Sequence, residues 1–165
     1  EITCRDWSSD VCSSDLALKQ MAANAYDALR TSFPDSVRYT ENYEKLLVRL
    51  DSLDTACAEA LRQADVHTIV IYHPALTYYA ADYGLEQLAV EHDGKEPSAR
   101  HLARLIEEAR RKKVRRVFYQ AQYPASTVKV IAEDIGARSV KIDPLREDVI
   151  ENIGEITRQL TSGNE

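Results

Sequence analysis

From residue 66 onward, strand-like and helix-like segments alternate, and this alternation constrains the fold more than any other feature of the chain. Short runs of β-branched and aromatic residues are typical of buried strands. They predict strands near 68–72, 87–91, 115–119 and 138–142, with helices near 76–82, 99–112, 124–135 and 145–161. Alternation of this kind is typical of a parallel sheet with helices on its faces. We therefore predict an α/β fold: a single lobe with a four-stranded parallel sheet flanked by helices.

Two helical patterns precede this lobe. Apolar residues at spacings of three and four, from Leu18 to Leu29, predict a helix over about 17–31. A longer helix is predicted over about 39–63, where the apolar stripe consists of Tyr43, Leu46, Leu47, Leu50, Leu53, Cys57 and Leu61. At the rise of an α-helix this segment is roughly 37 Å long, enough to cross a whole domain. We expect a helical segment at 17–63, including this long connecting helix, followed by the lobe at 64–165.

Residues 1–16 form a segment unlike the rest of the chain. The stretch from Asp6 to Asp15 can be back-translated into a common short-read sequencing adapter. Serine and aspartate dominate the segment, which shows no helical or strand period, and such a composition is typical of disorder. We therefore interpret 1–16 as a disordered, adapter-derived scar and exclude it from fold reasoning. The natural N-terminus, with any signal peptide, is expected to be missing.

Composition excludes several classes of protein. Trp7, Cys4 and Cys12 lie in the first segment, so only Cys57 remains, and no disulfide framework can be argued. Cys57 falls on an apolar stripe, which predicts a buried, unreactive thiol. The formal net charge is −6, of which the first sixteen residues carry −3, and no basic stripe indicates nucleic-acid binding. No apolar run approaches the roughly 18 residues that a membrane span requires.

Polar side chains follow the predicted strands where each strand ends. His73 comes directly after the run Thr68-Ile69-Val70-Ile71-Tyr72, and Pro74 then stops the strand because it has no N–H to donate. Asp143 follows the last predicted strand. In a parallel sheet all of these ends meet at one edge, where ligands bind. A neutral imidazole and a carboxylate are suitable ligands for a borderline divalent cation, although two ligands are too few for a tight site.

Four blocks of sequence, in this order and spacing, indicate a family. They are His73–Leu85, Gly94–Ser98, Val117–Tyr123 and Ile142–Leu145. Together they resemble the C-terminal lobe of zinc- and manganese-binding substrate-binding proteins of ABC transporters. The resemblance runs from about Ala17 to Leu160, which is nearly all of the interpretable chain.

The resemblance implies a metal site between two lobes. In that family two histidines come from the N-terminal lobe, and His73 and Asp143 match the third and fourth ligands. The long helix at 39–63 matches the helix that connects the lobes. The implied cargo is Zn²⁺, with Mn²⁺ as the alternative, because histidine at position 73 favours zinc. The implied partner is an ABC permease subunit. The implied location is periplasmic or extracellular, with a lipid anchor as an option in the intact protein.

Several residues keep a second interpretation. Asp143 in Asp-Pro-Leu also fits the N-cap of the following helix. Gln120 and Gln122 are either hydrogen-bond partners of the ligands or polar loop residues. His92, after the second strand, is an auxiliary ligand candidate.

Two histidines are not expected at the site. His67 lies at the opposite end of the strand that His73 ends, roughly 20 Å away, and cannot share a site with it. His101 lies in the first turn of a helix and is expected to be solvated.

Two other classes of function remain as alternatives. A small α/β enzyme would use His73 and Asp143 as an acid/base pair. No nucleophile motif or glycine-rich phosphate loop supports it, and Gly94–Ser98 lacks the glycine spacing of a P-loop. A metal-free adhesion or interaction module is the other alternative. A metal held by four protein ligands has no open position for catalytic water, which favours a binding protein over an enzyme.

Overall fold

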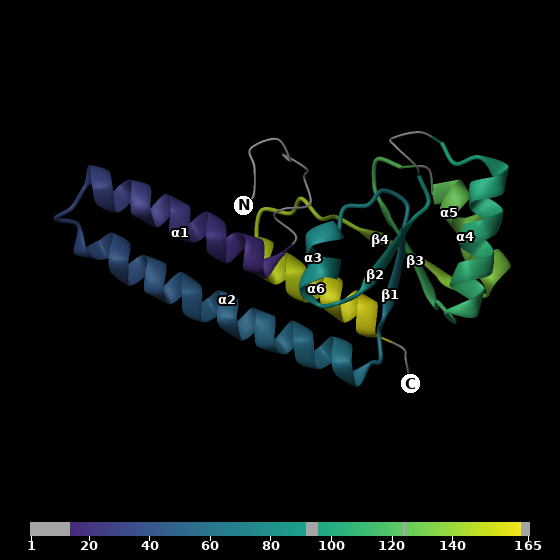
Figure 1. Cartoon of the computed structure of the whole chain (residues 1–165), viewed down its shortest axis with the longest axis horizontal. Coiled ribbons are helices and arrows are strands. Elements are labelled where there is room, and N and C mark those ends of the chain that lie inside the picture. The colour runs from purple at the N-terminus through teal and green to yellow at the C-terminus, as the bar shows by residue number, and fades with distance from the viewer. Residues whose placement is uncertain (1–13, 92–95, 124, 163–165) are drawn as a thin grey trace.

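The lobe is built on a parallel sheet of four strands. The computed structural model describes residues 14–91, 96–123 and 125–162. The strands are β1 (Thr68–Ile71), β2 (Glu86–Ala89), β3 (Arg116–Gln120) and β4 (Arg138–Ile142). They pair in the order β2-β1-β3-β4, and every neighbouring pair is parallel. The predicted α/β class and sheet are confirmed (Figure 1).

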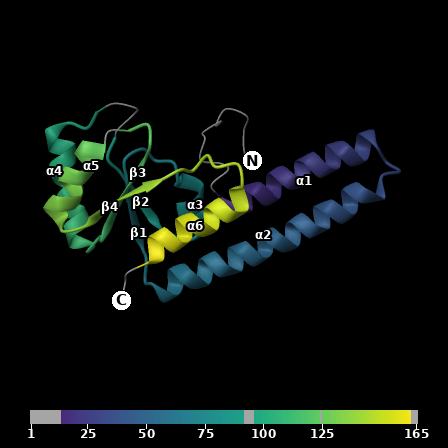
Figure 2. The same ribbon diagram turned by 180° about the vertical axis from the view of Figure 1, so that it is seen from behind.

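Helices cover both faces of the sheet and close two hydrophobic cores. Helices α4 (Ala99–Arg111) and α5 (Ala125–Ile135) lie on one face, and α3 (Thr77–Asp82) and α6 (Val149–Thr161) lie on the other (Figures 1 and 2). Side chains of β1 alternate between the cores: Ile69 and Ile71 enter one, and Val70 enters the other. All three are fully buried. Their short apolar run therefore forms the centre of the lobe.

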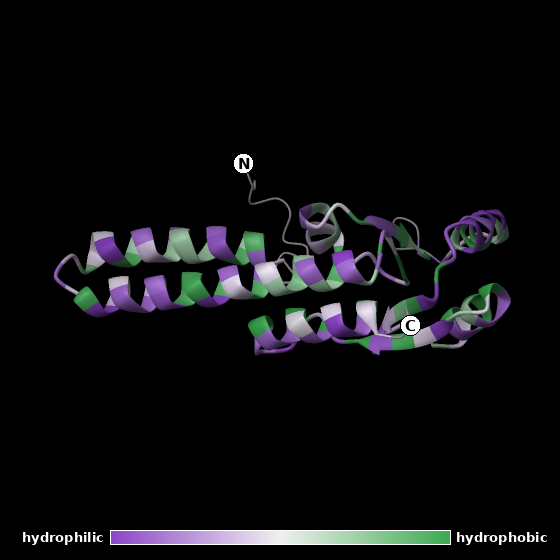
Figure 3. Cartoon of the chain, turned by 90° about the horizontal axis from the view of Figure 1, so that it is seen from below, coloured by the Kyte–Doolittle hydropathy of each residue, from purple (hydrophilic) through white to green (hydrophobic). Residues whose placement is uncertain are grey.

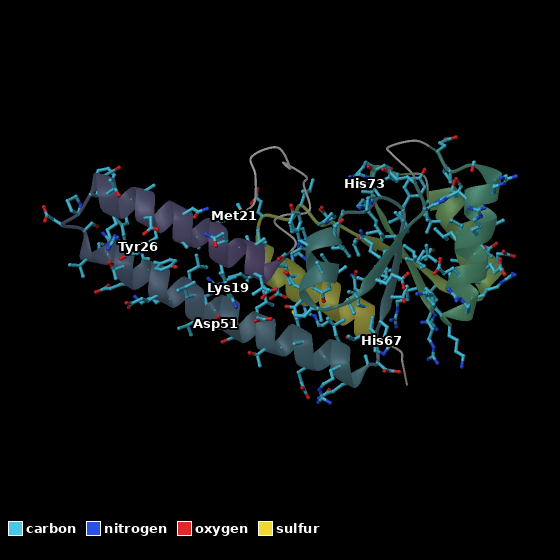
Figure 4. All side chains as sticks on the ribbon, viewed as in Figure 1. Lys19, Met21, Tyr26, Asp51, His67 and His73 are labelled. Carbon is cyan, nitrogen blue, oxygen red and sulfur yellow. The ribbon has the colours of Figure 1, made fainter. Side chains whose placement is uncertain are left out.

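Two long helices extend away from the lobe as an antiparallel hairpin. They are α1 (Asp15–Ser32) and α2 (Val37–Gln63) (Figure 1). The rings of Tyr26 and Tyr43 stack between them with centroids 4.4 Å apart. Lys19 reaches across to Asp51 at 2.8 Å, in the space between the two helices (Figure 4). None of the described helices is long and apolar enough to cross a membrane.

The C-terminal half of α2 belongs to the core of the lobe. Cys57 and Leu61 are buried in the same cluster as Ile69 and Ile71. Burial raises the pKa of the Cys57 thiol, as predicted for an unreactive cysteine. The outer half of the hairpin is different: hydrophobic and hydrophilic residues intermingle along it (Figure 3), and Leu29 and Val37 are exposed.

Two predicted boundaries are wrong. The last helix begins at Val149 and not at 145, because Asp148 caps it by accepting a hydrogen bond from the Glu151 N–H at 3.1 Å. Helix α1 begins at Asp15, inside the segment predicted to be a disordered scar. The Ser14 hydroxyl caps α1 by accepting from the Ala17 N–H at 3.0 Å. The remainder of that segment, 1–13, lies outside the described residues.

Asp15 is a fully buried carboxyl group at the junction of α1, α2 and α3. Its Oδ1 accepts a hydrogen bond from the Tyr83 hydroxyl at 2.8 Å, whereas its Oδ2 has no hydrogen-bond partner among the described residues. Burial raises the pKa of this carboxyl, and the negative charge of Asp54 adds to the effect. A buried acceptor without a partner costs about 1–3 kcal/mol. Asp15 therefore destabilises the fold when it is ionised.

We expect Asp15→Asn to be more stable than the wild type at neutral pH. Because the pKa of Asp15 is raised in the folded state, the protonated carboxyl does not destabilise the fold at low pH. Stability is lost as the pH rises through that pKa and the carboxyl ionises. The gain should be on the order of 1 kcal/mol, about 2–4 °C in Tm, and should vanish as the pH falls towards about 4. Thermal melts over this pH range measure it, with exposed Asp27→Asn as the control. A variant no more stable than wild type at neutral pH would contradict the prediction.

Two helices end on a left-handed residue that is not glycine. Asp65 after α2 and Lys113 after α4 have φ of 53° and 54°. Gly136 holds the same place after α5, with φ of 69°. The left-handed conformation costs a residue with a Cβ roughly 1–2 kcal/mol. The ends of α2 and α4 are therefore strained, and the end of α5 is not.

Substitutions at these positions should have opposite signs. Lys113→Gly should raise the unfolding free energy by up to about 1 kcal/mol, and Gly136→Ala should lower it by a similar amount. An added Cβ at Gly136 meets no atom within 4 Å, so only the backbone conformation is tested there. Urea denaturation measures both variants. Shifts of the same sign would contradict this account.

Candidate metal-binding edge of the sheet

His73 and Asp143, predicted to converge, do lie at the carboxyl edge of the sheet, together with other polar residues that end or follow its strands. His73 follows β1, Glu91 follows β2, Gln120 ends β3 and Asp143 follows β4. Hydrogen bonds extend the ladder beyond the strands, since the Glu91 N–H donates to the Tyr72 carbonyl at 3.0 Å. Parallel pairing therefore places these side chains side by side in the order of the strands. Figure 4 shows His73 at this edge and His67 at the opposite one.

The His73 imidazole is held on two sides. Its Nδ1 lies 2.7 Å from Oε1 of Glu91, in a hydrogen bond between side chains of adjacent strands. Its ring stacks on Tyr123, with centroids 5.2 Å apart and an angle of 21° between the planes. The His73 side chain is 33% exposed and that of Glu91 only 9%. The imidazole is thus oriented by buried groups but remains open to solvent.

Gln120 holds the main chain of His73. It is buried, and its Nε2 donates to the His73 carbonyl at 3.0 Å. The Ala75 N–H donates to the same carbonyl at 2.7 Å. Of the two interpretations of Gln120, the structure supports a hydrogen-bond partner that acts through the backbone.

Asp143 is exposed and is not the cap of α6. Its Oδ1 accepts from the Leu145 N–H at 3.1 Å, which closes a local turn, and its carbonyl accepts from Asn152 Nδ2 at 2.8 Å. The capping function expected as the alternative belongs to Asp148. A ligand function for Asp143 therefore does not compete with helix capping.

His73 and Asp143 stand apart in the sheet by one intervening strand. Strand β3 lies between β1 and β4, so their backbones are separated by two interstrand spacings, about 10 Å. Two side chains that lean towards each other can span this distance around one ion. Among the described residues, no group of three or more His, Cys, Asp and Glu side chains is placed to hold a metal. The edge therefore supplies two candidate ligands rather than a complete site.

The remaining histidines lie elsewhere. His67 is at the opposite edge, exposed, and pairs with Asp65 at 2.9 Å. His101, expected to be solvated, instead places Nε2 at 3.2 Å from the Ala89 carbonyl, so its ring is partly covered. His92 lies outside the described residues, and its auxiliary role stays a prediction.

A cavity of about 330 Å³ opens at the edge opposite His73. Among the residues that line it are Lys112, Lys113, Arg115 and Arg116. Helices that flank a parallel sheet end at this edge, and cations suit the negative ends of helix dipoles. The basic residues after α4 therefore lie where the carboxyl ends of the flanking helices favour positive charge.

Sequence reasoning missed Glu91 and Tyr123 as neighbours of His73. Glu91 lies outside the four blocks and Tyr123 ends the third, and they are 18 and 50 positions away from His73 along the chain. Only the pairing of β2 with β1 places Glu91 beside the imidazole. A carboxylate at the end of a predicted strand was the available signal, but its use required the strand order.

Asp143 and Asp148 should differ in how much each contributes to the stability of the fold. We expect Asp148→Ala to lower the unfolding free energy by about 1 kcal/mol, the usual loss for a helix N-cap, or about 2–4 °C in Tm. Asp143→Ala should cost clearly less, because it loses only a turn contact on an exposed loop. Parallel thermal melts test this. A larger loss in Asp143→Ala would mean that Asp143 is a structural residue.

Comparison with known proteins places these residues in context. Residues 14–161 match the family described as "Zinc-uptake complex component A periplasmic" (ZnuA). The zinc-binding lipoprotein AdcA of Streptococcus pneumoniae is 31% identical over 122 residues, which cover 72% of this chain and 24% of AdcA. ZnuA of Bacillus subtilis, named a high-affinity zinc uptake system protein, is 27% identical over 115 residues, 68% of this chain and 36% of that protein. The chain thus spans well under half the length of these relatives.

Solved structures agree with the sequence matches. A crystal structure of ZnuA superposes with a TM-score of 0.87 at 28% identity, over 94% of this chain and 62% of that chain. The periplasmic zinc-binding protein TroA of Treponema pallidum gives a TM-score of 0.78 at 15% identity, over 99% of this chain and 66% of TroA. At that identity the TroA match shows a shared fold alone.

Proposed function

The chain belongs to the zinc-uptake complex component A family, and on that premise we propose that the intact protein binds zinc outside the cytoplasmic membrane and delivers it to an ABC permease. His73 and Asp143 are the ligands that this chain contributes. The supporting observation is their position: both follow strands at the same edge of the parallel sheet, and neither is needed to cap a helix. That edge is where such sheets bind ligands.

Zinc is the proposed cargo rather than manganese. Imidazole suits zinc, whereas sites richer in carboxylate and water suit manganese. Tight zinc sites need four ligands, or three and a water. We propose that the other ligands come from the part of the protein that this chain does not span. The described edge is therefore half of the metal site.

Binding is favoured over catalysis by the same geometry. In an acid/base pair each group must lie within hydrogen-bond reach, about 3 Å or one water, of the proton that it transfers. His73 is instead hydrogen-bonded to Glu91, and a whole strand separates it from Asp143. The family is also one of uptake components and not of enzymes.

Zinc titration calorimetry tests the proposal. Because half of the ligands are absent, we expect a Kd no tighter than about micromolar, or −8 kcal/mol. His73→Ala and Asp143→Ala should each weaken binding at least about tenfold, and Mn²⁺ should bind more weakly than Zn²⁺.

Matched controls accompany these variants. His67→Ala removes a histidine from the other edge, and Asp148→Ala removes the nearby helix cap, so both should bind zinc like the wild type. Equal losses in His67→Ala and His73→Ala would indicate adventitious surface binding. Undiminished binding by His73→Ala would overturn the proposal.

A further inference from the structure

Glu91 is a carboxylate that the fold keeps nearly out of solvent at the candidate metal edge. Its side chain is 9% exposed, and within the described part of the chain its ion-pair partner is His73. Burying a carboxylate is unfavourable unless it is hydrogen-bonded or paired. The contact with the imidazole offsets that penalty, which gives a physical reason to look for a role of this pair beyond packing.

The pair lies directly beyond the paired ends of β1 and β2, and backbone hydrogen bonds continue the pairing up to it. Strands β1 and β2 align Ile71 with Ala89. Two further hydrogen bonds continue the ladder to Glu91: Val90 N–H to the Ile71 carbonyl at 2.8 Å, and Glu91 N–H to the Tyr72 carbonyl at 3.0 Å. Sites supported by regular elements hold their geometry more closely than sites on loops.

The other contacts of His73 restrict the ring further. Tyr123 stacks on the imidazole and also packs against Tyr72, with ring centroids 5.0 Å apart. Gln120 fixes the His73 carbonyl from the opposite neighbouring strand. With the ring plane and the backbone both set, the remaining variable is which nitrogen carries the proton.

We propose that Glu91 is a positioning residue that fixes His73 as the Nδ1–H tautomer, so that Nε2 is the atom that ligates the metal. A neutral imidazole whose Nδ1 donates to a carboxylate has its only free lone pair on Nε2. A hydrogen bond of this kind also fixes the orientation of the ring of a ligating histidine. This inference rests on the proposed function, in which His73 binds zinc.

Glu91 acts through His73 and not as a ligand itself. Its Oε1 is engaged by Nδ1 at 2.7 Å, and direct ligation would break that bond. For Glu91 to bind the metal directly, its side chain, which is only 9% exposed, would have to move into solvent, or the ion would have to enter the interior of the lobe. The geometry therefore favours a Glu91 that orients His73 over a Glu91 that binds the metal itself.

The first test is nitrogen NMR of the metal-free protein at about pH 8, where an ordinary imidazole is neutral. We expect the His73 ring of the wild type to be the Nδ1–H tautomer. Glu91→Ala should shift it towards the Nε2–H form, whereas Glu86→Ala, at the other end of β2, should leave it unchanged. A wild-type ring in the Nε2–H form would overturn the inference, whatever the zinc affinity.

The second test is zinc calorimetry on the same proteins. Glu91→Ala should weaken binding about 10–100-fold, the usual effect of losing the partner of a ligating histidine. Glu91→Gln, whose amide oxygen still accepts from Nδ1–H, should lose less and should keep the tautomer. A loss in Glu91→Gln as large as that in His73→Ala would indicate direct ligation and overturn the positioning role. Unchanged affinity in Glu91→Ala would also overturn it.

The two tests separate failure of this inference from failure of the proposed function. If His73→Ala binds zinc as well as the wild type, the proposed function fails even where NMR shows the Glu91-dependent tautomer. If His73→Ala loses binding and Glu91→Ala does not, the function stands and the role of Glu91 fails. A lower Tm in Glu91→Ala with the tautomer and affinity unchanged would mean a purely structural residue.

Discussion

The structure depends above all on the burial of β1 on both faces. Ile69, Val70 and Ile71 have no exposed surface, because α2, α3 and α6 cover one face of the sheet and α4 and α5 cover the other. A strand buried in this way needs partners on both edges, which β2 and β3 supply. Parallel pairing then carries every strand to the same edge. The proximity of His73, Glu91 and Gln120 is a consequence of that single constraint.

The long helix α2 connects this buried centre to the outer hairpin. Its C-terminal half is anchored by Cys57 and Leu61, which pack with residues of β1 and α6. Its N-terminal half lies against α1 through Tyr43 and Tyr26. The C-terminal half of α2 therefore packs in a closed apolar core, whereas its N-terminal half is partly exposed.

Two sets of polar side chains inside the fold differ in their surroundings. Near the candidate metal edge, Gln120 is buried and Glu91 is nearly so; Gln120 hydrogen-bonds the His73 carbonyl and Glu91 the His73 ring. At the junction of α1 and α3, Asp15 is buried; among the described residues its Oδ1 accepts a hydrogen bond from Tyr83 and its Oδ2 has no partner. The first group orients the proposed ligand His73, and its burial has an explanation in the proposed function. The second lies in the adapter-like stretch, and its burial is destabilising.

Much of this was determined by the sequence alone. The apolar runs and helical stripes were sufficient for the parallel sheet, the buried part of α2 and the edge on which His73 and Asp143 lie, because periodicity reports burial directly. Tertiary structure decided what periodicity does not encode. It showed that Asp148 and not Asp143 caps α6, that α1 begins at Asp15, and that Glu91 is hydrogen-bonded to the His73 ring. Each of these depends on strand order or on which of several polar groups reaches a backbone N–H, and only the folded chain specifies those distances.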